Sequence, residues 1–210
     1  MAQTLLRDYR ALWEAWNAGG GPRYPSEKVV QFTYRNFPAA IRSTVRTLDL
    51  GCGSGANTWF LAREGFPVVG SDLTSHGLAN TRNRLLAEGL SAELVQADAT
   101  HLPFRNASFE YVICVRVLEL IPNTELQDRL IGECARVLRS SGRGLALFAS
   151  PKDYGSQYPE KGFGPFFPPD EQQVERLFRS RFSKVDIDVY QTTYESGRLM
   201  EHNYLVTFVK

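Results

Sequence analysis

The stretch Leu48-Asp49-Leu50-Gly51-Cys52-Gly53-Ser54-Gly55 decides the fold of this 210-residue chain. Leu48 and Leu50 give a short strand its apolar face. The glycines that follow permit positive φ angles and remove the Cβ atoms that would hold a ligand away. A helix after such a turn points its free N-terminal N–H groups at whatever lies on the loop. The stretch therefore predicts a strand, a glycine-rich turn and a helix that together hold a nucleotide-like ligand.

Two kinds of ligand fit this glycine turn. The run 51–56 satisfies the dinucleotide pattern G-x-G-x-x-G/A, and Asp72 follows about 20 residues on, where it would hold a ribose. However, Asp49 stands two residues before the first glycine and would repel a pyrophosphate as a like charge. The same carboxylate would attract a ligand that carries an ammonium and a sulfonium group. We therefore favour the second kind of ligand over a dinucleotide.

Acid-x-Gly-x-Gly-x-Gly is the signature of class I S-adenosylmethionine-dependent methyltransferases, and the chain resembles them from about residue 46 to residue 150. Stretches similar to the second, third and fourth strands of that family follow in order at 67–72, 93–99 and 108–115. The resemblance implies an α/β, Rossmann-like fold. It has a seven-stranded, mostly parallel sheet, helices on both faces and an antiparallel C-terminal strand pair. It also implies S-adenosylmethionine as the cofactor, S-adenosylhomocysteine as the product and no metal.

The resemblance assigns residues to the cofactor. Asp72 would grip both ribose hydroxyls, and Asp98 would accept a hydrogen bond from the adenine amino group. Asn57 would either contact the methionine end of the cofactor or cap a helix. Tyr24 would either fold over the cofactor or pack against the rest of the protein. The expected cofactor contacts are Asp49, Gly51, Cys52, Gly53, Ser54, Gly55, Asn57, Asp72, Leu73, Asp98, Ala99, Val115 and Tyr24.

Catalysis makes few demands on side chains, because methyl transfer from a sulfonium is an in-line displacement that mainly needs donor and acceptor to be positioned. Glu119 is the candidate catalytic residue, since a general base is needed only where the nucleophile carries a proton that leaves early. The alternative is that Glu119 is a structural acid at a helix start. Many relatives have histidine at the next position, whereas this chain has Leu120, which argues against a histidine base there.

Substrate choice is expected to lie outside the shared motifs, in residues 1–40 and 152–169. The second segment is rich in glycine, proline and aromatic residues and follows the expected fifth strand, at the edge where open α/β sheets bind ligands. Its aromatic side chains either enclose an apolar or planar acceptor or belong to a plain connector. The expected substrate contacts are Tyr154, Tyr158, Phe163, Phe166 and Arg116.

Further patterns predict the secondary structure around this core. Helices are expected at about 57–64, 75–88 and 124–138, and Asp170-x-x-Gln173 resembles a capping box that opens another helix. Strands that include 185–189 and 203–209 are expected to pair antiparallel, with His202 in a loop before the last one. An N-terminal amphipathic helix is expected from the spacing of the apolar residues Leu5, Tyr9, Leu12, Trp13 and Trp16.

The composition fits one domain over residues 1–210, with a helical cap at 1–40, a cofactor-binding core at 46–150, a substrate loop at 151–169 and a C-terminal helix and strand pair at 170–210. A net charge of +1 gives no large field to attract nucleic acid or a membrane surface. No signal peptide or apolar run of about 20 residues is evident. Three scattered cysteines suit a reducing compartment, so we expect a cytoplasmic protein. The oligomeric state cannot be read from the sequence.

Together these observations favour methyl transfer from S-adenosylmethionine to a small molecule. No Asn/Asp-Pro-Pro-Tyr/Phe follows the fourth strand and no Pro-Cys pair occurs, which argues against methylation of adenine or glutamine amino groups and of cytosine C5. A non-catalytic S-adenosylmethionine-binding module and an RNA methyltransferase stay open as alternatives. An NAD-dependent oxidoreductase is disfavoured by Asp49 and Asp98.

Overall fold

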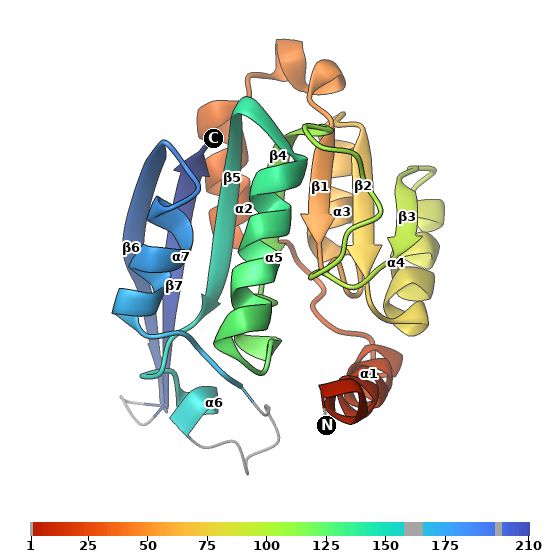
Figure 1. Cartoon of the computed structure of the whole chain (residues 1–210). Coiled ribbons are helices and arrows are strands. Elements are labelled where there is room, and N and C mark those ends of the chain that lie inside the picture. The colour runs from red at the N-terminus through yellow and green to blue at the C-terminus, as the bar shows by residue number, and fades with distance from the viewer. Residues whose placement is uncertain (1, 158–165, 196–198) are drawn as a thin grey trace. The chain divides into compact units, whose positions relative to one another are not determined.

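The computed structural model describes residues 2–157, 166–195 and 199–210. The chain falls into two compact units, Met1–Pro103 and Phe104–Lys210. The helices and strands of each unit are labelled in Figure 1. The glycine-rich turn and most of the expected cofactor contacts belong to the first unit. Glu119 and the expected substrate contacts belong to the second. The prediction of one domain over the whole length stays a prediction.

The first unit is built on three parallel strands: β1 (Thr47–Leu50), β2 (Val68–Asp72) and β3 (Glu93–Gln96), in the order β3-β2-β1. Every residue of β1 and β2 is buried, the polar ones included, as expected of parallel strands that are covered on both faces. In the register, Leu50 pairs with Ser71. Because parallel strands end at the same edge, the turn after β1 and Asp72 after β2 come together there.

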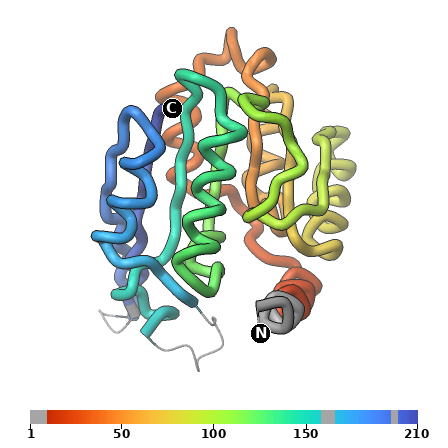
Figure 2. The backbone as a smooth tube through the Cα atoms, viewed as in Figure 1, coloured from red at the N-terminus to blue at the C-terminus, as the bar shows by residue number. Residues whose placement is uncertain are grey.

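Four α-helices and one short 3-10 helix complete the first unit: α1 (Ala2–Ala18), α2 (Glu27–Asn36), η1 (Ala39–Thr44), α3 (Ala56–Arg63) and α4 (Ser75–Ala87). The path from β1 through α3 to β2 and on through α4 to β3 can be followed in Figure 2. Both crossover helices pack against β2 and against each other. They begin and end within one residue of the predicted bounds.

The second unit contains β4 (Phe109–Val115), β5 (Leu138–Ala149), β6 (Lys184–Tyr194) and β7 (Leu199–Val209), in the order β4-β5-β7-β6. β4 and β5 are parallel, whereas β7 runs antiparallel to both β5 and β6. Its helices are η2 (Leu118–Leu120), α5 (Thr124–Val137), α6 (Tyr154–Gln157) and α7 (Glu171–Arg179). The seven described strands thus form the mostly parallel sheet with an antiparallel C-terminal pair, which confirms the Rossmann-like fold predicted from the sequence.

An aromatic cluster forms the core of the second unit. Phe148 of β5 stacks on Phe178 of α7 with ring centroids 6.3 Å apart, and Phe178 lies 5.6 Å from Phe208 of β7. Gly144 pairs with Phe208 across β5 and β7, and a Cβ added to Gly144 would lie 2.1 Å from a ring carbon of Phe208. This glycine is therefore required by packing, since its own φ is not positive.

The start of α7 confirms half of the predicted capping box. The Asp170 carboxylate accepts a hydrogen bond from the Gln173 backbone N–H at 2.8 Å, as the motif requires. The Gln173 side chain does not return the bond; it donates to the Gln127 side-chain oxygen at 2.6 Å. Because Gln127 is buried on α5, the Gln173 side chain joins α7 to α5 instead of completing the capping box.

The N-terminal helix α1 forms as its apolar spacing predicted. Leu12 is 41% exposed and Trp16 is 50% exposed, whereas the polar Asn17 is buried at 6% exposure. The side chains of Leu5 and Tyr9 lie outside the described part of the chain. Trp13 is half-buried, so the apolar positions are covered only in part, and α1 also contacts α4 through polar side chains, as described below. No helix of the described residues has both the length and the apolar character needed to span a membrane.

Candidate active site

The glycine-rich turn after β1 adopts the backbone that its sequence predicts. Gly51, Gly53 and Gly55 have φ angles of 73°, 51° and 80°. The backbone N–H groups of Gly51 and Cys52 donate to the Ser71 carbonyl at 2.7 and 2.9 Å, which ties the turn to β2. A Cβ added to Gly55 would lie 2.6 Å from the Thr81 hydroxyl, so only glycine fits where the turn enters α3.

Asp72 at the end of β2 joins this turn to the start of α4. Its Oδ2 accepts a hydrogen bond from the Gly53 N–H at 2.8 Å. Its Oδ1 accepts from the Thr74 N–H at 2.9 Å and from the Thr74 hydroxyl at 2.6 Å. Donors on both oxygens hold the carboxylate in one orientation beside the glycine turn. The residue expected to grip the ribose is therefore fixed next to the loop expected to carry the ligand.

Asp49 is 1% exposed and lies on β1 directly before the turn. Its Oδ2 accepts a hydrogen bond from the Thr58 hydroxyl at 2.6 Å. Burial raises the pKa of Asp49 to about 7; the Thr58 bond opposes this rise and the negative charge of Asp72 adds to it. A cation close to Asp49 would offset the burial and favour the charged carboxylate. The carboxyl group that the sequence suggested would attract a cationic ligand can therefore gain or lose its proton near neutral pH.

Asp98 and Leu73 lie at the same strand edge. The Ala97 N–H donates to the Asp72 carbonyl at 2.9 Å, and the Gln96 side chain donates to the Leu73 carbonyl at 3.0 Å. These bonds join the segments that leave β2 and β3. Asp98 Oδ1 accepts from the Thr100 N–H and hydroxyl, both at 2.8 Å, and Asp98 and Ala99 are half-buried. The predicted adenine contacts are therefore held within the same unit as Asp72.

The remaining predicted cofactor residues of this unit contact the connection between α1 and α2. Ser54 donates from its hydroxyl to the Pro22 carbonyl at 3.2 Å, and Asn57 accepts at 2.9 Å from the Ser26 N–H. Cys52 is buried, and burial raises the pKa of its thiol well above its ordinary value, which argues against a reactive thiol at this position. Tyr24 is 77% exposed. Its predicted position over the cofactor stays a prediction.

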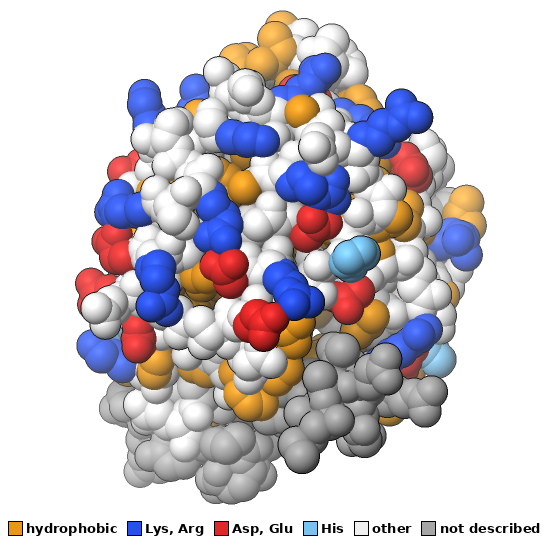
Figure 3. All heavy atoms as spheres, in the orientation of Figure 1, with side chains coloured by type: hydrophobic (Ala, Val, Ile, Leu, Met, Phe, Trp, Pro, Cys, Tyr) orange, Lys and Arg blue, Asp and Glu red, His pale blue; other side chains and the backbone are white. Residues whose placement is uncertain are grey.

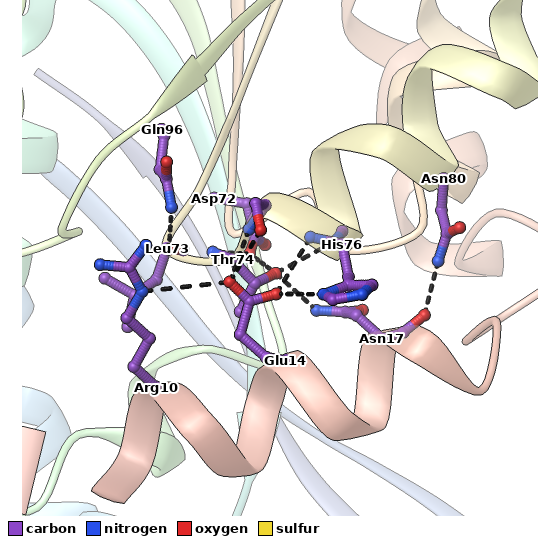
Figure 4. Close-up of polar contacts among 11 residues, drawn as sticks. Arg10, Glu14, Asn17, Asp72, Leu73, Thr74, His76, Asn80 and Gln96 are labelled. Carbon is purple, nitrogen blue, oxygen red and sulfur yellow. Dashed lines mark hydrogen bonds and ion pairs between the residues drawn. The ribbon is translucent and has the colours of Figure 1, made fainter. Parts of the chain in front are cut away.

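Sequence reasoning missed the part of α1 that faces this site (Figure 4). Glu14 accepts from the backbone N–H groups of Ser75 and His76 at 2.9 and 3.0 Å, and it lies 2.8 Å from the His76 ring nitrogen Nδ1. Although burial opposes the change, these hydrogen bonds lower the pKa of Glu14 to about 2. The first turn of α4 has no acidic residue of its own. Glu14 supplies the negative charge that a helix N-terminus favours.

Asn17 contacts the same region one turn further along α1. Its side-chain Nδ2 donates to the Thr74 hydroxyl at 2.8 Å, and its backbone carbonyl accepts from Asn80 of α4. One feature of the sequence could have indicated this contact. The first turn of the expected helix 75–88 has no acidic residue, so a negatively charged partner from elsewhere in the chain would be favourable there. Nothing local says that α1 provides that partner, because more than fifty positions separate Asn17 from Thr74.

Glu119 in η2 of the second unit is completely buried. Its Oε1 lies 3.0 Å from Arg116 Nε and accepts from the Ala149 N–H at 3.2 Å. Its Oε2 has no hydrogen-bond partner among the described residues. Burial raises the pKa of Glu119, the Arg116 charge opposes the rise, and the nearby Asp153 adds to it. The candidate base is thus a carboxyl group with one occupied and one free oxygen.

Arg116 connects Glu119 to the segment expected to bind substrate. It lies directly after β4 with φ at 60°, its Nη1 donates to Asn203 Oδ1 at 2.7 Å, and its guanidinium carbon lies 5.4 Å from the centre of the Phe166 ring. The Phe167 N–H donates to the Glu119 carbonyl at 2.6 Å. The described C-terminal end of the expected substrate segment is therefore attached beside Arg116 and Glu119.

The other predicted residues of this unit are placed as follows. Tyr154 begins α6 and is half-buried, and Val115 ends β4 and is half-buried. Tyr158 and Phe163 lie outside the described residues. His202, which the sequence suggested to be a loop residue, is buried on β7 with its Nδ1 2.7 Å from the Ser150 hydroxyl. The prediction was wrong because β7 begins four residues before the expected strand.

Comparison with known proteins agrees with this geometry. Residues 47–142 match the family model described as a methyltransferase domain. A fatty-acid O-methyltransferase from Mycolicibacterium smegmatis is 39% identical over 109 residues, which are 51% of this chain and 38% of that protein. A ubiquinone biosynthesis O-methyltransferase from Xylella fastidiosa is 29% identical over 151 residues, or 70% of this chain and 58% of that protein. The chain thus spans about two fifths and three fifths of these relatives.

The fold has solved counterparts as well. A crystal structure of an S-adenosylmethionine-dependent methyltransferase from Methanosarcina mazei superposes with a TM-score of 0.66 at 22% identity, covering 79% of this chain and 92% of that one. Residues 47–142 therefore match a methyltransferase domain, and the fold is the one expected from the class I, S-adenosylmethionine-dependent motifs of the sequence. The cofactor that these motifs imply is S-adenosylmethionine.

The residues of the first unit fit this cofactor. Among the described residues, a Cβ added to Gly53 would meet only Asn17 Oδ1 within 4 Å, at 3.6 Å, so there is space beside this glycine. Asp72 and Asp98 present carboxylate acceptors of the kind that ribose hydroxyls and an adenine amino group require. The buried Asp49 would carry negative charge once a cation lies beside it, because the cation offsets the burial that raises its pKa. An acceptor-rich, acidic loop suits a cationic nucleoside better than a pyrophosphate.

Proposed function

We propose that this chain transfers the methyl group of S-adenosylmethionine to a small-molecule acceptor. When bound, the cofactor supplies a methyl group on a positively charged sulfur, which is electrophilic without help from a metal. The observation that carries the proposal is the Asp72 carboxylate, bonded to the Gly53 N–H at 2.8 Å and flanked by the buried Asp49. This combination of a bare glycine turn and two acids at adjacent strand ends is suited to a cationic nucleoside.

The first unit would bind and orient the cofactor. Asp72 would hold the ribose hydroxyls, while Asp98 would accept from the adenine amino group. Asp49 would interact with the positively charged methionine end, and the glycine turn would let the ligand lie close to the backbone. Because these groups are already fixed by hydrogen bonds to the turn and to neighbouring loops, little side-chain ordering remains to be done on binding.

The second unit would contact the acceptor through Arg116, Glu119 and the aromatic side chains of segment 152–169. The acceptor heteroatom forms its bond to the methyl carbon as the carbon–sulfur bond breaks, and any proton on that heteroatom must leave. Glu119 Oε2 has no donor among the described residues and is therefore available to take that proton. Glu119 is sealed from solvent, whereas the Arg116 side chain is 41% exposed. Arg116 would therefore have to shift for an acceptor to reach Glu119.

A small-molecule acceptor is supported by the names of two relatives, a fatty-acid O-methyltransferase and a ubiquinone biosynthesis O-methyltransferase. The charge distribution agrees with this choice. Figure 3 shows Lys and Arg side chains intermixed with Asp and Glu side chains across the visible face, in keeping with a net charge of +1. A strong single-sign field, which would favour a polyanionic acceptor such as RNA, is not seen on that face among the described residues.

Thermal unfolding with saturating ligands tests the cofactor site. At about 100 times its Kd, S-adenosylhomocysteine should add about 2.7 kcal/mol to the free energy of unfolding, which is a rise in Tm of about 5–10 °C for a chain of this size. NAD should give no rise, and a rise with NAD alone would contradict the proposal. Asp72→Ala should abolish most of the rise caused by S-adenosylhomocysteine.

Transfer itself is tested with S-adenosylmethionine labelled in its methyl group and a panel of hydroxylated, carboxylated and amino compounds. Label should move to at least one small compound. Cofactor binding without transfer to any member of the panel would favour a non-catalytic binding module. Transfer to RNA, with RNA binding that weakens steeply as salt is added, would favour the RNA methyltransferase alternative.

A further inference from the structure

A continuous chain of hydrogen bonds links α1 to the acid that is expected to hold the ribose (Figure 4). Asn17 Nδ2 donates to the Thr74 hydroxyl at 2.8 Å, and that hydroxyl donates to Asp72 Oδ1 at 2.6 Å. All three side chains are buried, with exposures of 6%, 1% and 9%. A residue of the N-terminal helix is thus one side chain removed from the Asp72 carboxylate.

The direction of these bonds follows from the chemistry of a hydroxyl group. A threonine hydroxyl has one proton and two acceptor lone pairs. Here both Asn17 Nδ2 and the Gly77 N–H, the latter at 3.2 Å, donate to the Thr74 oxygen. Neither of those groups accepts, so the single proton of Thr74 is directed to Asp72 Oδ1. Asn17 therefore helps to determine which way the Thr74 hydroxyl points.

The hydrogen bonds that join α1 to the start of α4 come from polar groups of α1. Leu12 and Trp16 are exposed, while Glu14 and Asn17 make the hydrogen bonds to the start of α4. Asn17 Oδ1 also lies 3.6 Å from the place that a Cβ on Gly53 would occupy. Asn17 thus lies where the glycine turn, Thr74 and α1 meet, and apolar packing alone does not explain why an amide is buried there.

We propose that Asn17 is a positioning residue for the cofactor: acting through the Thr74 hydroxyl, it orients the Asp72 carboxylate toward the ribose hydroxyls. The N-terminal helix is then part of the cofactor site, and no other described element supplies this amide to Thr74. The inference rests on the proposed function in one respect, namely that Asp72 holds the ribose.

The test is a double-mutant cycle on the binding of S-adenosylhomocysteine, measured by titration calorimetry with Asn17→Ala, Asp72→Ala and the double variant. Loss of one hydrogen bond that orients a charged acceptor should weaken binding about 3- to 10-fold in Asn17→Ala. Because Asn17 acts through Asp72, the double variant should bind no more weakly than Asp72→Ala alone. Losses that multiply in the double variant would overturn the proposal.

Asn80→Ala is the matched control for the docking of α1. It removes the hydrogen bond from Asn80 to the Asn17 backbone carbonyl and leaves the path from Asn17 to Asp72 intact. Its affinity for S-adenosylhomocysteine should stay within about twofold of the wild type. An equal loss in Asn80→Ala and Asn17→Ala would mean that α1 acts only as a structural cover, against the proposal.

A second pair of variants keeps the test decisive if Asn17→Ala does not fold. Thr74→Val removes the hydroxyl, whereas Thr74→Ser retains it. Serine should restore most of the affinity that valine loses, and equal affinities in the two variants would overturn the proposal. Failure of the proposed function is recognised separately, because Asp72→Ala would then bind S-adenosylhomocysteine as the wild type does.

Discussion

Replacing Asp49 by asparagine separates the charge of this buried side chain from its shape. Burial raises the pKa of Asp49 in the folded protein from 3.8 to about 7, while the unfolded chain keeps the ordinary value. Between these pH values the folded protein holds a proton that the unfolded chain has lost. The free energy of unfolding should therefore fall as the pH rises through this window. At about 1.36 kcal/mol per pKa unit, the whole fall amounts to about 4 kcal/mol.

Asparagine has nearly the shape of the protonated carboxyl group and retains an acceptor for the Thr58 hydroxyl. We expect Asp49→Asn to match the wild type in stability near about pH 4 and to exceed it by about 4 kcal/mol above about pH 7. Urea unfolding of both proteins across this range measures the difference, in which the contributions of titrating groups far from Asp49 cancel. A difference that stays constant with pH would refute the reasoning, because Asp49 would then take up no proton on folding.

The same proton should respond to the cofactor. S-adenosylhomocysteine carries an ammonium group, and a cation near the ionised Asp49 lowers the pKa of that carboxyl. Binding near neutral pH should therefore release protons from the wild type and release fewer from Asp49→Asn. Calorimetric titrations in two buffers with different heats of ionisation count these protons. Equal release in the two proteins would place the ammonium away from Asp49.

Three further changes have specific expected outcomes. Gly144→Ala should destabilise the chain by about 1–3 kcal/mol in urea unfolding, because its Cβ would meet Phe208 at 2.1 Å, whereas Gly132→Ala, with its nearest neighbour at 3.7 Å, should be neutral or stabilising. Gly53→Val should abolish binding of S-adenosylhomocysteine in calorimetry, and retained binding would mean that the ligand does not lie on this turn. Glu119→Gln should slow methyl transfer about 100-fold or more to an acceptor that must lose a proton, as a radiolabel assay would measure. It should leave cofactor affinity unchanged, and full activity would assign Glu119 a structural role only.

Local chemistry explains which parts of the fold could be predicted. The turn after β1 depends on glycines at positive φ, and the start of α7 depends on Asp170 bonding to the Gln173 N–H. Both are interactions between residues close in sequence, so the pattern of residue types contains the information. The apolar residues Leu48 and Leu50 likewise indicated a buried strand, although the Asp49 between them is buried as well.

Contacts between distant residues explain what could not be predicted. The spacing of α1 indicated an amphipathic helix, but it did not indicate the hydrogen bonds of Glu14 to the start of α4 and of Asn17 to Thr74. A sequence can show that the first turn of a helix has no acidic residue. It cannot show which distant acidic residue interacts with that helix N-terminus, since any acid in the chain could do so. His202 likewise could be placed only once the length of β7 was known.

The sequence by itself determined the class of site: a glycine turn with acids before it and at the next two strand ends, which indicates S-adenosylmethionine. Only the tertiary structure decided the state of those acids. Asp49 titrates near neutral pH because it is enclosed, Asp72 is oriented through Thr74 and Asn17, and Glu119 retains one oxygen without a partner. Residue type sets what a group can do, whereas its solvation and its partners, which distant parts of the chain provide, set its charge and direction.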